Sequence, residues 1–198
     1  MEWCIPIQTF QVENVQLGTL TTGIKPIIPL AYKDADLTFP SLIFLLPPLK
    51  IKLYEPTTGR LILSLAECPQ VLSKLLMLQD MLLTATSVNQ TAWFKSNSPR
   101  KLSELRANFQ SMIHDNEMHL YCPNQNYQGQ GPNIYINGEW VRTAGLVSGM
   151  KVRVVMKIQG ISFHIHPASG TWSGKFRLQH RINTILVTPD LVGPGPQC

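Results

Sequence analysis

Basic side chains alternate with apolar ones in two stretches of this sequence, MKVRVVMKIQGISFHI and GKFRLQHRINTILV. Lysine and arginine bind anions, and a two-residue spacing places them on one face of a β-strand. If the two strands pair as a hairpin, six cations can share one surface, which would attract a polyanion, an acidic protein or an anionic lipid. The six are Lys151, Arg153, Lys157, Lys175, Arg177 and Arg181.

The positive charge of the chain is concentrated in this region. Residues 1–139 carry 10 basic and 11 acidic side chains, whereas residues 140–189 carry 7 basic and no acidic ones, and the whole chain has a net charge of +5. Like charges on neighbouring strands repel and cost stability. A polyanion ligand explains such a surface better than solubility does. The alternative is a solvated face whose acidic partners come from elsewhere in the fold.

Four aromatic residues lie in or beside the same strands. Stacking of bases on aromatic rings among cations is the usual way of binding a single strand without reading its sequence. The alternative for each ring is packing in the core. The combination indicates single-stranded nucleic acid and does not separate DNA from RNA. The four are Tyr135, Trp140, Phe163 and Trp172.

The rest of the chain predicts two β-rich regions around a helical block. Short β-prone runs fill residues 5–65, and an apolar period of three to four residues predicts a helix over 69–94. A second helix is expected to begin with Ser98 as its cap and Pro99 in its first turn, and to carry an apolar stripe as far as Met112. The stripe of the first helix is Val71, Leu75, Leu78, Leu82 and Ala85.

The last third returns to β structure. The Asn137, Gly138 pair predicts a tight hairpin ahead of the two long basic strands. This order of elements is typical of an α+β, mainly β domain built around one barrel or sandwich. We expect a single domain over residues 1–188, with a helical insertion at about 69–114 and a loose tail, rich in proline and glycine, at 189–198.

Other kinds of chemistry have little support in the sequence. The four cysteines form no CxxC pair, which favours reduced thiols. His164 and His166 would share a strand face, but no third ligand is placed beside them, so we expect no metal and no cofactor. No catalytic or phosphate-loop motif is present, and we expect no enzyme activity. We also expect no secretory signal, no membrane segment and no secretion, because no unbroken apolar run reaches about 18 residues.

Three longer stretches resemble one family. They are YKDADLTFPSLIFLLPPLKIKLYE, the stretch LQDMLLTATSVNQTAWFKSNSPRKLSELRANFQSMI with Asn89, Trp93 and Phe94, and GLVSGMKVRVVMKIQGISF followed by GKFRLQHRINTILV. In this order they are similar to the OB-fold single-stranded DNA-binding proteins of large eukaryotic DNA viruses, distant relatives of a phage replication protein. The resemblance implies an OB-type β-barrel with a helical insertion of about two helices. It also implies that the chain coats single-stranded DNA without sequence preference in viral genome replication, recombination or repair.

The sequence departs from this family in two places. The tail DLVGPGPQC has one acidic residue, whereas such proteins often recruit replication partners through an acidic run, and the loop HIHPASGTWSG is long. We therefore expect single-stranded DNA as the main partner, replication proteins and a second copy of the chain as further ones, and an intracellular location at sites of viral DNA replication. The alternative function is that of a virion or packaging protein whose basic face contacts the genome.

Overall fold

A computed structural model of the chain describes residues 3–23, 25–95, 98–123, 131–141 and 145–187. It is a mixed α+β structure, mainly β, and the described residues include two α-helices, with 45% of these residues in strands. This confirms the expected class. The predicted tail at 189–198 lies outside the described residues.

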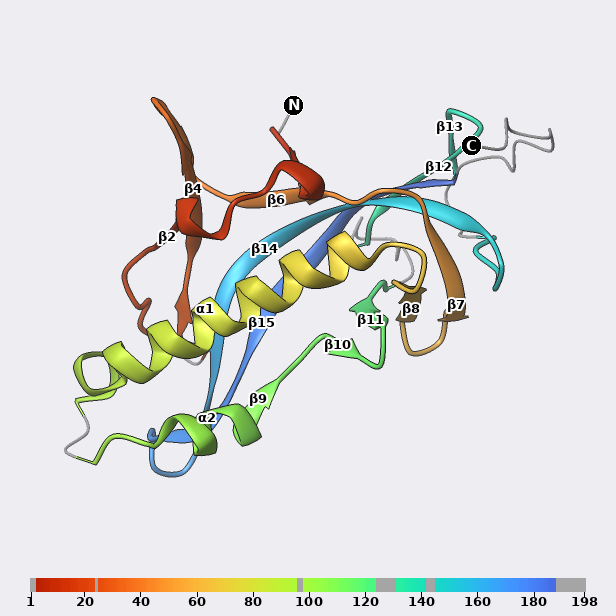
Figure 1. Cartoon of the computed structure of the whole chain (residues 1–198). Helices are drawn as coiled ribbons and strands as arrows, with labels where there is room; N and C mark the ends of the chain where they lie inside the picture. Colours follow the sequence, from red (N-terminus) through yellow and green to blue (C-terminus); the bar gives the residue numbers. More distant parts are fainter. Residues whose placement is uncertain (1–2, 24, 96–97, 124–130, 142–144, 188–198) are drawn as a thin grey trace.

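The centre of the structure is a long antiparallel hairpin of β14 (Lys151–Ile165) and β15 (Trp172–Val187). Both strands were expected from their alternating pattern, and their pairing confirms the predicted hairpin. The pairing is interrupted by register shifts at Val155/Met156, Ile158/Gly160 and Phe163/Ile165. Each shift bends the hairpin, because an extra residue on one strand increases the local twist. Figure 1 shows β14 and β15 curving together across the whole molecule.

The other strands of the large sheet join this hairpin on both sides. β3, β6 and β7 pair with β14, while β9 and β12 pair with β15. The strands in chain order are β1 (Ile5–Pro6), β3 (Ile27–Ile28), β6 (Leu42–Leu45), β7 (Leu49–Glu55), β8 (Arg60–Ser64), β9 (Phe109–Gln110), β10 (Ile113–His114), β11 (Glu117–Tyr121), β12 (Asn133–Ile136) and β13 (Glu139–Val141).

The main path through this sheet is open. It runs β10-β11-β8-β7-β14-β15-β12-β13, and no pairing joins its two ends among the described residues. The expectation of a closed OB-type barrel is therefore not met in the described part of the chain. The tight turn expected at Asn137 and Gly138 is confirmed, since both residues have positive φ, at 53° and 84°, between β12 and β13.

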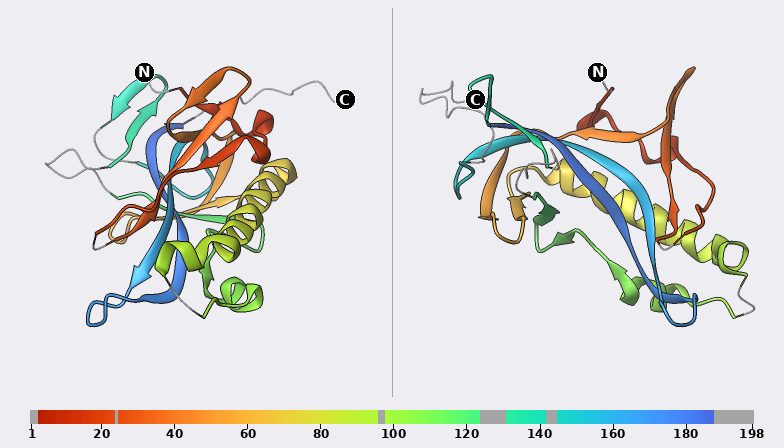
Figure 2. Two further views of the ribbon diagram at one scale, coloured as in Figure 1. Left: turned by 90° about the vertical axis from the view of Figure 1, so that its left-hand side faces the viewer. Right: turned by 180° about the vertical axis from the view of Figure 1, so that it is seen from behind.

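A second, three-stranded sheet projects from one side. It consists of β2 (Val15–Leu17), β4 (Leu30–Asp34) and β5 (Leu37–Phe39) in the order β2-β4-β5, after two short 3-10 turns, η1 (Ile7–Thr9) and η2 (Val12–Asn14). Figure 2 shows this arm and the β12–β13 hairpin standing apart from each other at the two ends of the molecule.

Helix α1 (Pro69–Phe94) packs along the inner face of the curved hairpin (Figure 1). Its bounds are those that the apolar period predicted, and Pro69 occupies the first turn, where the missing N–H costs nothing. Val71, Leu75, Leu78 and Leu82 are buried in the core as expected. Ala85, the fifth residue of the predicted stripe, is half-buried.

Helix α2 (Leu102–Asn108) begins later and ends earlier than expected. The reason for the late start is the buried amide of Gln90. It accepts a hydrogen bond from the backbone N–H of Arg100 and donates one to the carbonyl of the same residue, both at 2.9 Å. Arg100 is thereby held outside the helix, and the predicted cap at Ser98 and Pro99 is wrong. The helix ends at Asn108 because Phe109 pairs with Phe176 as part of β9.

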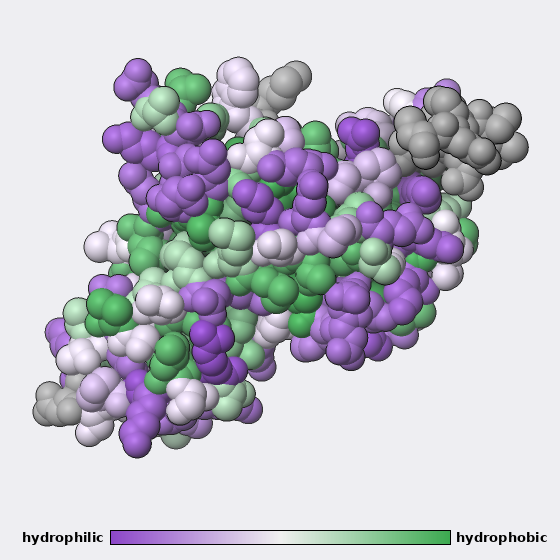
Figure 3. Space-filling view, viewed as in Figure 1, coloured by the Kyte–Doolittle hydropathy of each residue, from purple (hydrophilic) through white to green (hydrophobic). Residues whose placement is uncertain are grey.

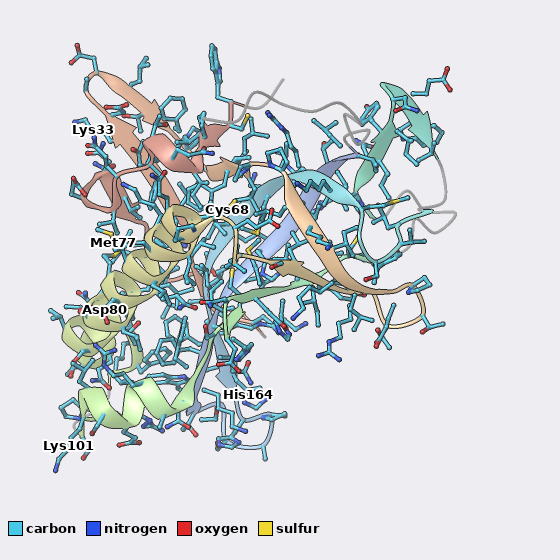
Figure 4. All side chains as sticks on the ribbon, turned by 45° about the vertical axis from the view of Figure 1, so that its right-hand side comes forward. Lys33, Cys68, Met77, Asp80, Lys101 and His164 are labelled. Carbon is cyan, nitrogen blue, oxygen red and sulfur yellow. The ribbon has the colours of Figure 1, made fainter. Side chains whose placement is uncertain are left out.

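The outer side of α1 carries exposed apolar side chains. Leu76 and Met77 are 45% and 46% exposed and Val88 is 75% exposed, and Figure 3 shows an apolar band on this face. Figure 4 places Met77 and Asp80 on this outer side, with Lys33 and Lys101 at separate ends of the molecule. By length and composition α1 could also cross a membrane, but its opposite side is buried against the sheet.

Two neighbouring positions on α1 test this orientation. Leu78 is fully buried and Met77 is about half exposed. We expect Leu78→Ala to lower the free energy of unfolding by about 2–5 kcal/mol, because truncation of a core leucine leaves a cavity. Met77→Ala is the matched control and should change it by about 0.5 kcal/mol or less. Urea denaturation measures both, and equal effects would contradict the packing of α1 on the sheet.

Gly160 tests the contact between β14 and β3. Its φ is +144°, and a Cβ at this position would lie 2.0 Å from the carbonyl oxygen of Ile28. Because both atoms belong to paired backbones, we expect Gly160→Ala to push β3 off the sheet and to destabilise the fold by several kcal/mol. Gly145→Ala is the control, since nothing lies within 4 Å of its Cβ position. If the two variants melted at the same temperature, the close approach of Gly160 to the carbonyl oxygen of Ile28 would be contradicted.

Candidate nucleic-acid interface

The hairpin has an apolar inner face towards α1. Along one cross-strand row, Val154 pairs with Ile185, which pairs with Ile134 of β12. The three side chains are 0%, 0% and 5% exposed. Because side chains alternate along a strand, the neighbouring rows point to the opposite, outer face. Seen from behind, the hairpin lies in front of α1, so the helix does not cover this outer face (Figure 2).

One outer row brings three of the predicted site residues together. Arg153 pairs with Leu186, Leu186 with Tyr135 of β12, and Tyr135 with Trp140 of β13. Arg153 is exposed, Tyr135 is half-buried and Trp140 is 49% exposed. Adjacent strands are about 4.8 Å apart, so the four side chains of this row span about 14 Å. The row places two aromatic rings and one guanidinium on the same surface.

The remaining predicted cations also lie on the outer face. Lys157 is half-buried and directly opposite Arg181, and Arg177 is opposite Ser162. Lys175, Arg177 and Arg181 are exposed and come from alternate positions of one strand. Among the described residues, these three and Arg153 form no ion pair with an acidic side chain.

Lys151 behaves differently from these cations. Its ammonium group lies 3.8 Å from the carboxylate of Glu67, at the end of the β8–α1 connection. For Lys151, the sequence-based alternative of a solvated cation with an acidic partner from elsewhere in the fold is therefore the right one. Both side chains are substantially exposed, so this ion pair is worth little in stability.

No protein-family model, curated protein or solved structure matches the chain.

Phe163 and Trp172 do not lie on the outer face, which corrects the prediction for both. Phe163 is 2% exposed, and its ring contacts those of Phe94 and Phe176 in the core. The register shift at Gly160 inverts the alternation of β14, so that residues beyond it point the other way. Trp172 is half-buried, stacked on Phe94 at 4.6 Å, with the guanidinium carbon of Arg100 4.9 Å from its ring.

A pocket of about 670 Å³ lies beside β15 and was not predicted from the sequence. The pocket lies where β15 has no strand on this side in the described part of the chain, between its pairing with Gln110 of β9 and its pairing with Asn133 of β12. Tyr121 from β11, Gln159, Gln179, Arg177 and Arg181 are among its lining residues. Tyr121 is 56 residues or more from the arginines in sequence, and no local signal connects them.

His180 lines the same pocket as a neutral side chain. Burial is the main reason that its pKa falls from 6.5 to about 4, and the positive charge of Arg177 lowers it further. Its Nε2 accepts a hydrogen bond from the backbone N–H of Tyr121 at 3.3 Å. The positive charge beside the pocket at neutral pH therefore comes from the two arginines.

Metal chemistry has no support at these positions. Within the described ranges, no group of three or more His, Cys, Asp or Glu side chains is placed to hold a metal ion. His164 and His166 contact each other, with ring centroids 6.0 Å apart, and His164 Nδ1 is 3.0 Å from the hydroxyl of Ser173. Cys4, Cys68 and Cys122 are free thiols, and Cys198 lies outside the described residues.

The neutral state of His180 predicts a pH dependence of stability. In the unfolded chain it takes up a proton near pH 6.5, whereas in the folded protein it resists protonation down to about pH 4. The unfolded state then binds more protons, so the free energy of unfolding should fall as the pH falls from about 6.5 to about 4. His180→Gln should reduce this fall, and the exposed His166→Gln should not. Urea denaturation at pH 7.5 and pH 5 measures the free energy of unfolding of each variant. If it fell as much in His180→Gln as in the unchanged protein, the lowered pKa of His180 would be contradicted.

Proposed function

We propose that the chain binds single-stranded DNA on the outer face of the β14–β15 hairpin, without reading its sequence. The observation that carries the proposal is a set of exposed cations that have no acidic partner among the described residues. They lie on the same face as the rings of Tyr135 and Trp140. Arginine and lysine would neutralise phosphates and release counterions, and the rings would stack on bases.

The cost of this surface supports a ligand. Arg177 and Arg181 form no ion pair with an acidic side chain among the described residues, and cations on one face of a sheet repel each other. Alternate residues of β15 are about 6.8 Å apart, so its cations form a line rather than a single cluster. A line of cations suits an extended polyanion better than a compact anion. No cofactor is needed, and no reaction is proposed.

Tyr135 and Trp140 favour a single strand over duplex. Their rings lie in the same outer row as Arg153, at the end of the hairpin that carries β12 and β13. Bases of an extended single strand are free to stack on such rings, whereas those of a duplex stack on one another. The alternative of a virion protein that contacts packaged genome remains an outcome of the binding experiment below.

The resemblance to viral OB-fold proteins supports the same ligand and a role at sites of viral DNA replication. An OB-type arrangement of the whole chain is part of that proposal rather than its basis, because the described sheet is open. The proposed binding surface consists of the β14–β15 hairpin with its neighbours β12 and β13, which carry Tyr135 and Trp140. Such a surface does not depend on closure of a barrel.

Ligand choice is the first test. We expect a labelled dT oligomer to bind more tightly than a duplex of equal length in a fluorescence-polarisation titration, because only the single strand offers bases to Tyr135 and Trp140. Poly-U of the same length measures the preference for DNA over RNA. Equal affinity for single strand and duplex would contradict the proposal and favour a general binder of polyanions.

The second test removes charge from the outer face. The triple substitution of Arg153, Arg177 and Arg181 by Gln should leave the fold intact, because all three are exposed. Affinity for the dT oligomer should fall, and the slope of log affinity against log salt should decrease by about 2, at about 0.7 for each phosphate contact.

The matched control makes the same change of charge elsewhere. The control variant replaces three exposed lysines outside the hairpin: Lys25, Lys33 and Lys101. Their substitution by Gln should alter the salt slope little. A larger effect of the control than of the hairpin variant would show that the strand binds a different face of the molecule.

A further inference from the structure

The pocket beside β15 combines three kinds of group. Gln159 and Gln179 supply two amides. Gln159 is the extra residue of the bulge before Gly160, and Gly160 pairs with Gln179, so the two amides occupy neighbouring positions. Arg177 and Arg181 supply positive charge, and Tyr121 supplies an aromatic ring.

The ring of Tyr121 is placed by a glycine on the β7–β8 turn. Gly59 has a φ of +69°, and a Cβ there would lie 2.9 Å from Cε2 of Tyr121. Only glycine combines this backbone conformation with so close an approach of the ring. Tyr121 is nevertheless 61% exposed. It therefore retains a large accessible surface at the side of the pocket, rather than filling the core.

These groups match the parts of one nucleotide. An aromatic ring stacks on a base of any kind, side-chain amides bond the donors and acceptors of a base edge, and arginine pairs with phosphate through its planar fork. The volume of about 670 Å³ is within the usual range for small-molecule sites. The buried, neutral His180 adds no charge that would change this preference.

We infer that this pocket holds a single nucleoside phosphate unit, with its base against Tyr121 and the two glutamines and its phosphate at Arg177 and Arg181. The inference deepens the proposed function and rests on it where the nucleotide belongs to a bound strand. In that case one base leaves the outer face and enters the open edge of β15. A free mononucleotide presents the same chemistry, so the experiment must separate the two sources.

The test uses the full chain and thymidine 5′-monophosphate as the probe. Isothermal titration calorimetry should show saturable binding of the monophosphate, weaker binding of thymidine and weaker binding of inorganic phosphate. Tyr121→Ala should weaken binding of the monophosphate about tenfold or more, whereas Tyr121→Phe should bind it as the unchanged protein does. Trp3→Ala, which removes a ring that is 80% exposed outside the pocket, is the control and should change nothing.

A second variant separates base from phosphate recognition. The double substitution of Arg177 and Arg181 by Gln should remove the preference for thymidine monophosphate over thymidine, while thymidine itself still binds. A circular dichroism melt checks that each variant is folded. If the preference survived in this variant, the phosphate would lie elsewhere and the inference would be overturned.

The outcomes distinguish the two proposals. Binding of a dT oligomer without measurable binding of the monophosphate, and without an effect of Tyr121→Ala, overturns the pocket and leaves the proposed function. Binding of the monophosphate without binding of the oligomer supports a site for free nucleotides and overturns the proposed function. Failure of both probes overturns both. Competition between monophosphate and oligomer supports a nucleotide of the strand in the pocket.

Discussion

Pairing of β14 with β15 is the interaction on which the described structure depends. Three strands reach the sheet through β14 and two through β15, and α1 packs on the inner rows of both. The alternation of side chains along these two strands therefore sets two properties together. One face supplies much of the core, and the other carries cations that the core does not need.

The two faces oppose each other energetically. Repulsion between outer-face cations such as Arg177 and Arg181 acts against the pairing. Burial of rows such as Val154, Ile185 and Ile134 stabilises the pairing by about 1.5–3 kcal/mol for each large side chain. The apolar term is the larger, so the sheet can hold a repulsive surface. Binding of a polyanion would relieve that repulsion. Such a ligand would therefore raise the free energy of unfolding of the protein.

Much of this arrangement could be predicted from local patterns. The bounds of α1, the turn at Asn137 and the charged face of β15 all follow from periods of a few residues and from turn chemistry. The bulge at Gly160 could not be predicted, and it moved Phe163 to the opposite face. The pocket could not be predicted either, because Tyr121 comes from β11, far in sequence from the residues of β15 that it joins. The ion pair between Glu67 and Lys151 likewise depends on the fold and not on a local pattern.

The position of the hairpin in the chain has a consequence for how the protein forms. Among the described strands, residues 151–187 follow every strand that they join. β3, β6 and β7 therefore lack their β14 neighbour until the ribosome has made β14. Contacts between such distant residues form slowly, and unpaired strand edges in the interval invite pairing with other chains. A nascent chain would therefore depend on rapid synthesis of β14, or on chaperones, to protect these strand edges.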